Sequence, residues 1–406
     1  MLLKSSINNI IDAQRDNLSI QETGLPRETF PNIPNLASHA LIVSGVRRCG
    51  KSTLLYQLLK EKYPGAFYLN FEDPRLYEFE FTDFSRLDEV INDAGVEVLM
   101  FDEIQIIPQW ERYVRHKLDE KYKVVITGSN ASLLSKELGT KLTGRHLTKE
   151  LFPFSYTEFT LFKELKVGIN SLLQYLDIGG FPEYVKQEND EILNYLLEDI
   201  LMRDIAIRYG LRDVKSLQRL ALYLVSNIGK LITGNRLKSM LDLGSTNTIM
   251  EYLSHLESSY LFHFVPKFDY SLRKQIVNPR KVYAIDNGIV SANSGSFTDD
   301  KGRKLENLVF LHLRRFSKEI FYFSDNGECD FIVLKNTAPK AAIQVCYDLN
   351  SDNLTRELNG LVQALDFFNL KEGIIVTLDQ TDQIEQDGKL IKIVNGYDWL
   401  SSSPIE

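Results

Sequence analysis

The sequence predicts an α/β fold whose first third is built around a parallel β-sheet. Four apolar runs without polar alternation, typical of strands buried on both faces, occur at 40–44, 66–71, 96–101 and 123–127. Segments with helical spacing of apolar residues lie between them, and a glycine-bearing turn follows the first run. We therefore expect a sheet with helices on both faces.

Three domains are expected along the chain. The first, 1–165, begins with a short helix over 4–18 and an irregular, proline-containing approach to the sheet. The second, 166–295, has helical patterns and then three helices followed by two β-rich runs, which is the outline of a winged helix-turn-helix. The third, 296–406, alternates helices and strands and is expected to be a mixed α/β domain.

Composition excludes several classes of protein. The chain has 406 residues, is 44% hydrophobic and 25% charged, and so is neither disordered nor fibrous. Its net charge of −8 means that any nucleic-acid contact needs a local basic patch. Cys49, Cys329 and Cys346 are too few and scattered for a disulfide framework or a Cys-x-x-Cys zinc site. Because no signal peptide or membrane-length apolar run is present, we expect a cytoplasmic protein without a membrane partner.

A glycine-rich loop follows the first apolar run. Gly45-Val-Arg-Arg-Cys-Gly50-Lys51-Ser52 matches the phosphate-loop pattern G-x-x-x-x-G-K-[ST] in full. Its glycines allow backbone N–H groups to wrap a phosphate where the next helix begins. Lys51 is expected to reach the β- and γ-phosphates of ATP, and Ser52 to hold Mg²⁺. The predicted ATP-binding residues of the loop are Gly45, Val46, Arg47, Arg48, Cys49, Gly50, Lys51, Ser52 and Thr53.

Two carboxylates end the apolar run that begins near residue 98. Asp102 and Glu103 stand about fifty residues after the glycine loop, the arrangement of a Walker B motif. Asp102 is expected to bind the nucleotide's Mg²⁺, and Glu103 to act as the general base on the attacking water. The alternative for an isolated apolar run ending in Asp-Glu is an ordinary strand end.

Polar residues further along complete the predicted catalytic set, which is Lys51, Glu103, Asn130 and Arg145. Ser129 or Asn130, after the run at 123–127, is placed to contact water and the γ-phosphate, or else to cap the next helix. Arg145 is either a finger that completes a neighbouring subunit's site or an ordinary surface arginine.

These motifs together resemble the AAA-type ATPases of bacteria and archaea that carry a nuclease-like C-terminal domain of unknown function. The resemblance rests on Gly45–Ser52, on Phe101-Asp-Glu-Ile-Gln105, on Thr127-Gly-Ser-Asn130 and on Leu142-Thr-Gly-Arg145. It extends through Gly179-Gly-Phe-Pro182 and Asp286-Asn-Gly288, and so covers nearly the whole chain. It implies ATP binding but no defined physiological role.

The middle of the chain is basic although the whole chain is acidic. Between Arg212 and Lys281 there are eleven Lys and Arg against five Asp and Glu, a net charge of about +6. DNA contact and plain interdomain packing are the two alternatives for this region. A DNA contact would use Ser245, Thr246, Asn247 and His255 in a groove, and Lys267, Arg273 and Lys274 on phosphates.

The C-terminal domain has part of the residue pattern of PD-(D/E)XK nucleases. Glu306 and Asp330 fit the acidic positions, but Gln344 and Cys346 stand where that chemistry uses Glu and Lys. A neutral amide weakens metal binding, and no ammonium supports the attacking water. Nuclease activity is therefore disfavoured, although Asp325 or Glu328 could add a ligand, and Glu306 and Asp330 could instead be structural acids.

The sequence as a whole predicts an ATP-binding protein and a Mg²⁺-dependent ATPase. Its nucleotide state would control how the rear domains engage DNA or a protein partner. The alternative is a nucleotide-gated binding module with little turnover, because Lys51 and Asp102 permit binding without efficient cleavage. A homo-oligomer is compatible with the sequence.

Overall fold

The computed structural model divides the chain into two compact units, Met1–Leu151 and Phe152–Glu406. The structure describes residues 2–36, 38–130, 142, 144–242, 245–295 and 300–403. The domain boundaries expected near residues 165 and 295 stay predictions. No helix within these described ranges is long and apolar enough to cross a membrane.

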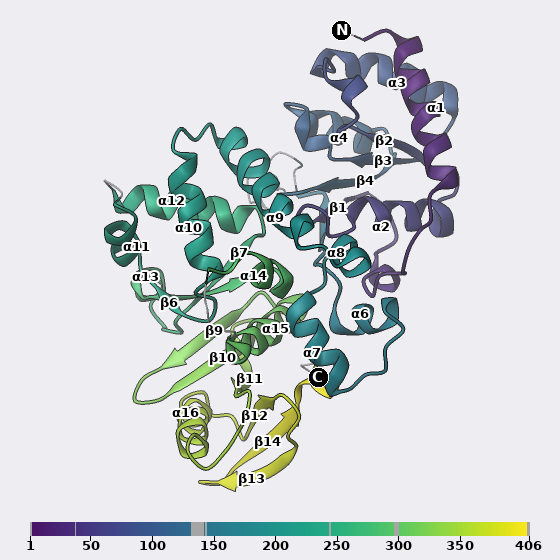
Figure 1. Ribbon diagram of the computed structural model, residues 1–406. Helices are drawn as coiled ribbons and strands as arrows, with labels where there is room; N and C mark the ends of the chain where they lie inside the picture. The colour runs from purple at the N-terminus through teal and green to yellow at the C-terminus, as the bar shows by residue number, and fades with distance from the viewer. Residues whose placement is uncertain are drawn as a thin grey trace. The chain divides into compact units, whose positions relative to one another are not determined.

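The first unit is built on a five-stranded sheet of order β2-β3-β4-β1-β5, in which every neighbouring pair is parallel (Figure 1). In Figure 1, α2 lies on one side of this sheet and α3 and α4 lie on the other. The elements of the unit are α1 (Lys4–Ile20), β1 (Ala40–Ser44), α2 (Lys51–Gln57), β2 (Phe67–Asn70), α3 (Phe84–Ala94), β3 (Val98–Asp102), α4 (Trp110–Asp119), β4 (Lys123–Gly128) and β5 (His146–Glu150).

The expected strands at the front of the chain are confirmed, but the sequence reasoning missed β5. The residues of β1 and β3 are all buried, as their unbroken apolar runs predict. By contrast, His146–Glu150 contains one large apolar residue, and its residues are exposed or half-buried because β5 is the edge strand. An edge strand exposes polar side chains and so has no apolar run to reveal it.

The segment before the sheet is tied to it by side-chain amides. Gln14 on α1 donates to the carbonyl of Asn70 at 3.1 Å, and its own amide oxygen accepts from the N–H of Asn70 at 2.8 Å. Gln57, at the end of α2, donates to the carbonyls of Thr23 and Leu25 at 2.9 and 2.8 Å. The chain that precedes β1 is therefore held against both the sheet and the helix after the glycine loop.

The second unit begins with helices and continues into a small antiparallel sheet of order β6-β8-β7. Three helices, α10 to α12, precede or interleave with its strands. The elements of this part are α6 (Tyr156–Phe162), α7 (Ile169–Ile178), α8 (Pro182–Gln187), α9 (Asp190–Asp199), α10 (Val214–Val225), β6 (Leu231–Ile232), α11 (Gly234–Leu241), α12 (Thr246–Ser258), β7 (Phe262–Pro266), α13 (Leu272–Val277), β8 (Arg280–Ala284) and α14 (Asn287–Asn293).

The second unit ends in a six-stranded mixed sheet of order β13-β14-β12-β11-β10-β9. β11, β12 and β14 run parallel and the outer pairs run antiparallel, while α16 joins β11 to β12 and packs on the sheet. The elements are α15 (Lys301–Phe316), β9 (Ile320–Ser324), β10 (Glu328–Lys335), β11 (Ala338–Val345), α16 (Leu354–Phe367), β12 (Glu372–Thr377), β13 (Asp382–Gln386), β14 (Lys389–Asn395) and α17 (Gly396–Leu400). The mixed α/β prediction for the rear of the chain is thereby confirmed.

Candidate functional site

The glycine loop of the first unit joins β1 to α2 at the carboxyl edge of the parallel sheet. A Cβ atom on Gly45 would lie 2.1 Å from the carbonyl oxygen of Leu151, so no larger residue fits there. Gly50 has φ 101°, a conformation that glycine adopts without strain. Both glycines of the motif are therefore required by the backbone itself.

The other loop residues differ in their environments. Val46 and Cys49 are buried, and the Cys49 thiol donates to the carbonyl of Leu151 at 3.3 Å. Burial raises the pKa of this thiol. Arg47 is 3.2 Å from Glu72, Arg48 is exposed, and Thr53 is half-buried on α2.

Lys51 is buried and points back into its own loop. Its ammonium donates to the carbonyls of Gly45 and Val46 at 3.1 and 3.2 Å, and lies 3.5 Å from a carboxylate oxygen of Glu103. These neutral acceptors keep the ammonium against the glycine loop. Lys51 and Glu103, which are 52 positions apart in the sequence, thus meet at one site.

Asp102 ends β3 and is completely buried. The Tyr68 hydroxyl donates to one of its oxygens at 3.0 Å and the Thr127 hydroxyl donates to the other, while Ser52 also hydrogen-bonds the carboxylate. Burial, followed by the charge of Glu103, raises the pKa of Asp102. Three hydroxyl groups therefore surround this buried carboxylate, and one of them belongs to the glycine-loop motif.

Glu103 follows Asp102 with φ 53°, in the left-handed region. Its N–H donates to the Thr127 hydroxyl oxygen at 3.0 Å, and the Gln105 amide donates to its carboxylate. Burial opposes its ionisation, but the Lys51 ammonium, Gln105 and Arg47 outweigh burial and lower the pKa of Glu103. A carboxylate that stays ionised beside the phosphate loop can accept a proton from water.

The polar residues after β4 lie between the glycine loop and Asp102. Because β4 is inserted between β1 and β3, its carboxyl end separates the ends of those two strands. Ser129 and Asn130 are buried there, and both have interaction partners. The structure therefore brings Asn130 to the same edge of the sheet as Lys51, Asp102 and Glu103.

Arg145 is not brought to this site within the chain. Its carbonyl accepts from the N–H of Ala40 at the amino end of β1, and its guanidinium donates to Asp119 at 2.7 Å. The neighbouring Arg145 lowers the pKa of Asp119. The glycine loop follows the opposite end of β1, so Arg145 has no cis contact with it, and its role as a finger for a neighbouring subunit stays a prediction. Thr143 of the same motif lies outside the described residues.

Two residues of the site were missed by the sequence reasoning. Arg27 is buried and donates to the carbonyl of Cys49 at 2.8 Å, so it supports the glycine loop from outside the motif. Tyr68 reaches Asp102 because β2 and β3 are parallel neighbours. The contact of Tyr68 with Asp102 could have been predicted by pairing the two strands as neighbours. Nothing near Arg27 in the sequence indicates its contact with the carbonyl of Cys49.

The donor set around Asp102 suits a hard divalent cation. The Ser52 hydroxyl and the Asp102 carboxylate are oxygen ligands of the kind that Mg²⁺ prefers, and they lie within hydrogen-bonding distance of each other. Mg²⁺ usually binds through one or two protein oxygens and completes its shell with water and phosphate. The two predicted metal ligands, Ser52 and Asp102, therefore fit the ion.

A buried lysine of the second unit lies among the acids of the nuclease-like pattern. The Lys281 ammonium, on β8, is 2.7 Å from Asp330, 2.7 Å from Glu328 and 3.3 Å from Glu306. Tyr283, also on β8, donates to Glu306 at 2.6 Å. Burial would lower the pKa of Lys281, but these carboxylates raise it well above its usual value.

The two positions that depart from the nuclease pattern have structural roles. The Gln344 amide donates to Glu357 at 2.6 Å, and its oxygen accepts from the N–H of Asp330 at 3.1 Å. Cys346 is buried, and its thiol donates to the carbonyl of Asp348 at 3.4 Å. Across the described part of the chain, His, Cys, Asp and Glu side chains form no group of three or more that could hold a metal ion.

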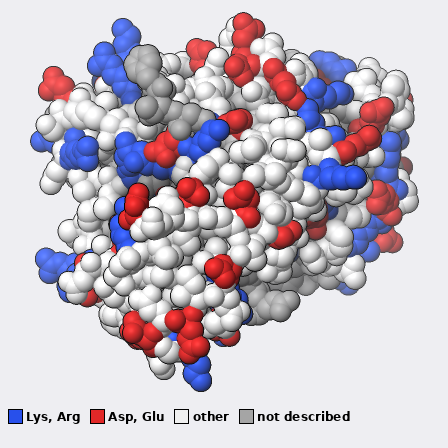
Figure 2. Space-filling view, turned by 60° about the horizontal axis from the view of Figure 1, so that its bottom comes forward, with Lys and Arg blue, Asp and Glu red and all other residues white. Residues whose placement is uncertain are grey.

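Basic and acidic side chains lie close together on the surface of the protein. Figure 2 shows Lys and Arg side chains lying beside Asp and Glu side chains on the displayed surface. Lys274 lies 3.7 Å from Asp269. The half-buried His255 ring stacks on Tyr209 at 3.8 Å between centroids, and its place in a DNA groove stays a prediction. Gly244, before the helix that would enter a groove, lies outside the described residues.

The sheet, the glycine loop and the acidic strand end define the first unit as an AAA-type P-loop domain. A family model described as an AAA domain matches residues 37–160, and a model described as a domain of unknown function matches residues 169–300. A solved structure of PCH-2 from Caenorhabditis elegans is similar at 15% identity and a TM-score of 0.24, covering 62% of this chain and 68% of that one.

Two relatives match almost end to end. The chain is 34% identical to the uncharacterized protein MJ1544 of Methanocaldococcus jannaschii, over 95% of this chain and 93% of that protein. It is 31% identical to an uncharacterized protein of Haemophilus influenzae, over 88% of this chain and 93% of that protein. The protein therefore belongs to the family of AAA-domain proteins that includes MJ1544.

Proposed function

We propose that the protein binds ATP with Mg²⁺ at the carboxyl edge of the first sheet and hydrolyses it. The observation that carries this proposal is the meeting of Lys51, Glu103 and the buried Asp102 beside one glycine loop. Each group has a distinct task in phosphoryl transfer, and the AAA-domain match supports nucleotide binding in general.

Lys51 binds the β- and γ-phosphates when its ammonium turns from the loop carbonyls toward the nucleotide. Ser52 and Asp102 hold Mg²⁺, which, when bound, neutralises the charge on the transferred phosphoryl group. Glu103, kept ionised by Lys51, orients the attacking water and accepts its proton. Asn130 positions the water or the γ-phosphate. Thr127 fixes Asp102 and the Glu103 backbone together.

Two substitutions separate binding from chemistry. Lys51→Ala should weaken ATP binding at least about tenfold, because it removes a ground-state phosphate contact. Glu103→Gln should keep the affinity but lower turnover by about 10²- to 10⁴-fold, because it removes the base. Fluorescent-nucleotide titration and phosphate release measure the two effects. The half-buried Lys123, paired with Glu97 at the other end of the sheet, provides the control Lys123→Ala.

The competing function is a nucleotide-gated binding module with little turnover. Gln105 bonds the Glu103 carboxylate, an arrangement that could hold the base away from water. Phosphate release at saturating ATP distinguishes the two functions. Wild-type turnover by Glu103→Gln would remove Glu103 from its assigned role, and absence of release from the wild-type protein would favour the binding module.

We further infer that the rear unit engages a partner under control of the nucleotide. The helices α10 to α12 with the sheet β6-β8-β7 support a winged helix, and the mixed sheet with α15 and α16 supports a degenerate nuclease-like domain. Lys281 supports the proposed loss of nuclease chemistry, because its ammonium already neutralises the acids that would bind metal. DNA contact, homo-oligomer formation and a cytoplasmic location stay predictions.

A further inference from the structure

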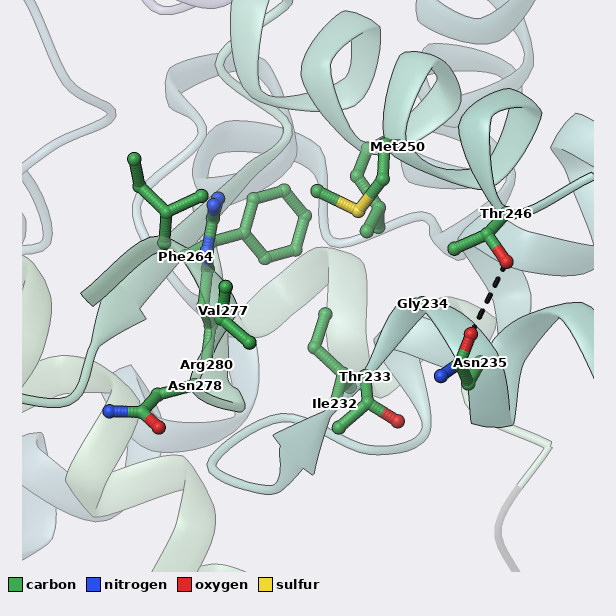
Figure 3. A pocket seen from close by; sticks show the side chains of 12 residues that line it. Ile232, Thr233, Gly234, Asn235, Thr246, Met250, Phe264, Val277, Asn278 and Arg280 are labelled. Atoms are coloured by element: carbon green, nitrogen blue, oxygen red, sulfur yellow. Dashed lines mark hydrogen bonds between the residues drawn. The ribbon is translucent and has the colours of Figure 1, made fainter. Parts of the chain in front are cut away.

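A pocket of about 210 Å³ lies in the second unit, where α12, β6, β7 and α13 meet. Figure 3 shows Met250, Phe264 and Val277 converging on it from α12, β7 and α13, while Thr246 and Asn235 are joined by a hydrogen bond to one side. Its apolar lining consists of Ile232, Met250, Leu253, Phe264, Ile276 and Val277. None of these residues takes part in the nucleotide site.

The pocket has a buried base and an exposed apolar mouth. Leu253 and Phe264 are buried, whereas Ile276 and Val277 at the mouth are 66% and 75% exposed. Tyr270 and Leu272, a few residues earlier, are 82% and 74% exposed. Single exposed apolar residues are common, but several on one short segment beside a pocket mark a binding surface. We call Tyr270, Leu272, Ile276 and Val277 the α13 patch.

Basic side chains lie on α11 and α13, two of the helices that contribute residues to the pocket. Arg273 and Lys274 alternate with apolar residues of the α13 patch, and Arg236 and Lys238 lie on α11, the helix that begins at the pocket. Within the described ranges, Arg236, Lys238 and Arg273 form no ion pair, and Lys274 lies 3.7 Å from Asp269. The surface thus offers apolar contacts together with uncompensated positive charge, which an acidic partner complements.

The size of the pocket limits what can enter it. Pockets for cofactors and small ligands usually have about 300–1,000 Å³, so this one suits one or two side chains. We propose that the α13 patch and its pocket bind an acidic segment of a partner protein. A large apolar side chain of that segment fills the pocket, and its carboxylates contact Arg236, Lys238 and Arg273. This interaction goes beyond the nucleotide chemistry proposed above and does not depend on it.

The same surface is poorly suited to DNA. Phosphates are bound by cations and by polar N–H and O–H groups, and apolar side chains placed against them gain nothing from leaving water. Four large apolar residues in the α13 patch would face such a backbone. Thr246 and Met250, on the first turns of α12, line the pocket and would be covered by its occupant.

Peptide binding to the full-length protein tests the proposal. The probe is a fluorescein-labelled pool of short peptides, rich in Asp and Glu, with Leu, Ile, Phe or Met at the centre. A pool with Ser at the centre and a labelled DNA duplex serve as comparison probes. The variants are Ile276→Asp and Arg273→Glu, with Leu161→Asp as the control because Leu161 is also an exposed helical residue of this unit, at 60%. Thermal unfolding shows that each variant remains folded.

The wild-type protein and Leu161→Asp should bind the acidic apolar pool equally well, and the Ser pool at least about tenfold more weakly. Ile276→Asp should weaken binding at least about tenfold by removing an apolar contact at the mouth. Arg273→Glu should weaken it and reduce its salt dependence. The proposal is overturned if the acidic apolar peptides do not bind, or if Ile276→Asp binds them as tightly as the wild-type protein does. It is also overturned if the protein prefers the DNA duplex and Ile276→Asp weakens binding to that duplex.

Discussion

Lys51 and Lys281 are both buried beside carboxylates, but the two lysines have different acceptors. Lys51 donates to two backbone carbonyls and is 3.5 Å from Glu103. Lys281 contacts carboxylates directly, at 2.7 Å from both Asp330 and Glu328. The Lys51 ammonium can move away from its neutral carbonyl acceptors at a small cost in free energy. If the Lys281 ammonium moved away, buried carboxylate charges would have no counter-charge.

This difference separates a lysine that is available to a ligand from one that is a fixed counter-ion. An ammonium held by carbonyl oxygens can turn to a phosphate, which is a stronger acceptor because it is charged. An ammonium held by several carboxylates already has acceptors of that strength. Motifs that list only residue types cannot distinguish these cases, because both contain Lys, Asp and Glu.

The largest expected effect is the loss of stability in Lys281→Met. Removing the ammonium leaves buried carboxylates without a counter-charge, so the free energy of unfolding should fall by about 3–5 kcal/mol at pH 7. The control is Lys392→Met, which breaks an exposed pair with Glu372 and should change stability by less than about 1 kcal/mol. Urea denaturation of both variants measures the difference, and equal losses would show that Lys281 is not a structural counter-ion.

A smaller effect separates Glu306 from Asp330, two of the three acids around Lys281. Burial, and then the nearby Asp330, raise the pKa of Glu306 to about 7, so at pH 6 this carboxyl is mostly protonated. Glu306→Gln should therefore lower the unfolding free energy by less than about 1 kcal/mol at pH 6, against about 1–3 kcal/mol for Asp330→Asn, which removes an ionic partner of Lys281.

The pH dependence of Glu306→Gln has a definite sign. A raised pKa stabilises the folded chain fully below the usual Glu pKa of 4.5, and this contribution is lost as the pH rises through about 7. The variant should therefore gain stability relative to the wild-type protein between pH 4.5 and 7. A relative loss over that interval, measured by urea denaturation, would contradict the protonated state of Glu306.

The smallest expected effect concerns DNA cleavage, because we expect neither the wild-type protein nor its variant to cleave DNA. Plasmid incubated with the wild-type protein and Mg²⁺ or Mn²⁺ should remain intact. The double variant Gln344→Glu, Cys346→Lys should also be inactive, because a carboxylate at 344 would face Glu357, to which Gln344 now donates at 2.6 Å. Lys281 would still neutralise Asp330. Cleavage by the wild-type protein that is abolished in Asp330→Ala would contradict the lapsed-nuclease interpretation.

Local sequence patterns predicted four of the five strands of the first sheet, and the residues that meet at its carboxyl edge, because these signals are short in range. A loop between a strand and a helix positions Gly45, Lys51 and Ser52 by itself, and the parallel sheet then brings Asp102 alongside. The side chains of Ser129 and Asn130 follow the strand inserted between the two. The spacing of the motifs and the direction of the strands were therefore sufficient to predict that these residues lie at one edge of the sheet.

The contacts of Arg27 and Lys281 could not be predicted in this way. Arg27 meets the carbonyl of Cys49 across an irregular segment, and Lys281 is 49 residues from Asp330. The sequence contains one indication of the contact of Lys281. Lys281 begins an apolar run that predicts a strand, and a charge that is buried in such a strand needs a partner. The sequence indicated that a partner must exist, but only the fold identifies it, because Lys281 of β8 lies 2.7 Å from Asp330 of β10.

The amides that hold the segment before β1 have a practical consequence for anyone who expresses the nucleotide-binding unit alone. The AAA-domain match begins at residue 37, which invites a fragment that starts there. Such a fragment would lack Gln14 and the carbonyls that accept from Gln57, and it would remove the Arg27 guanidinium from beneath the glycine loop. Cloning boundaries for this unit should therefore begin ahead of α1, so that the loop keeps its own support.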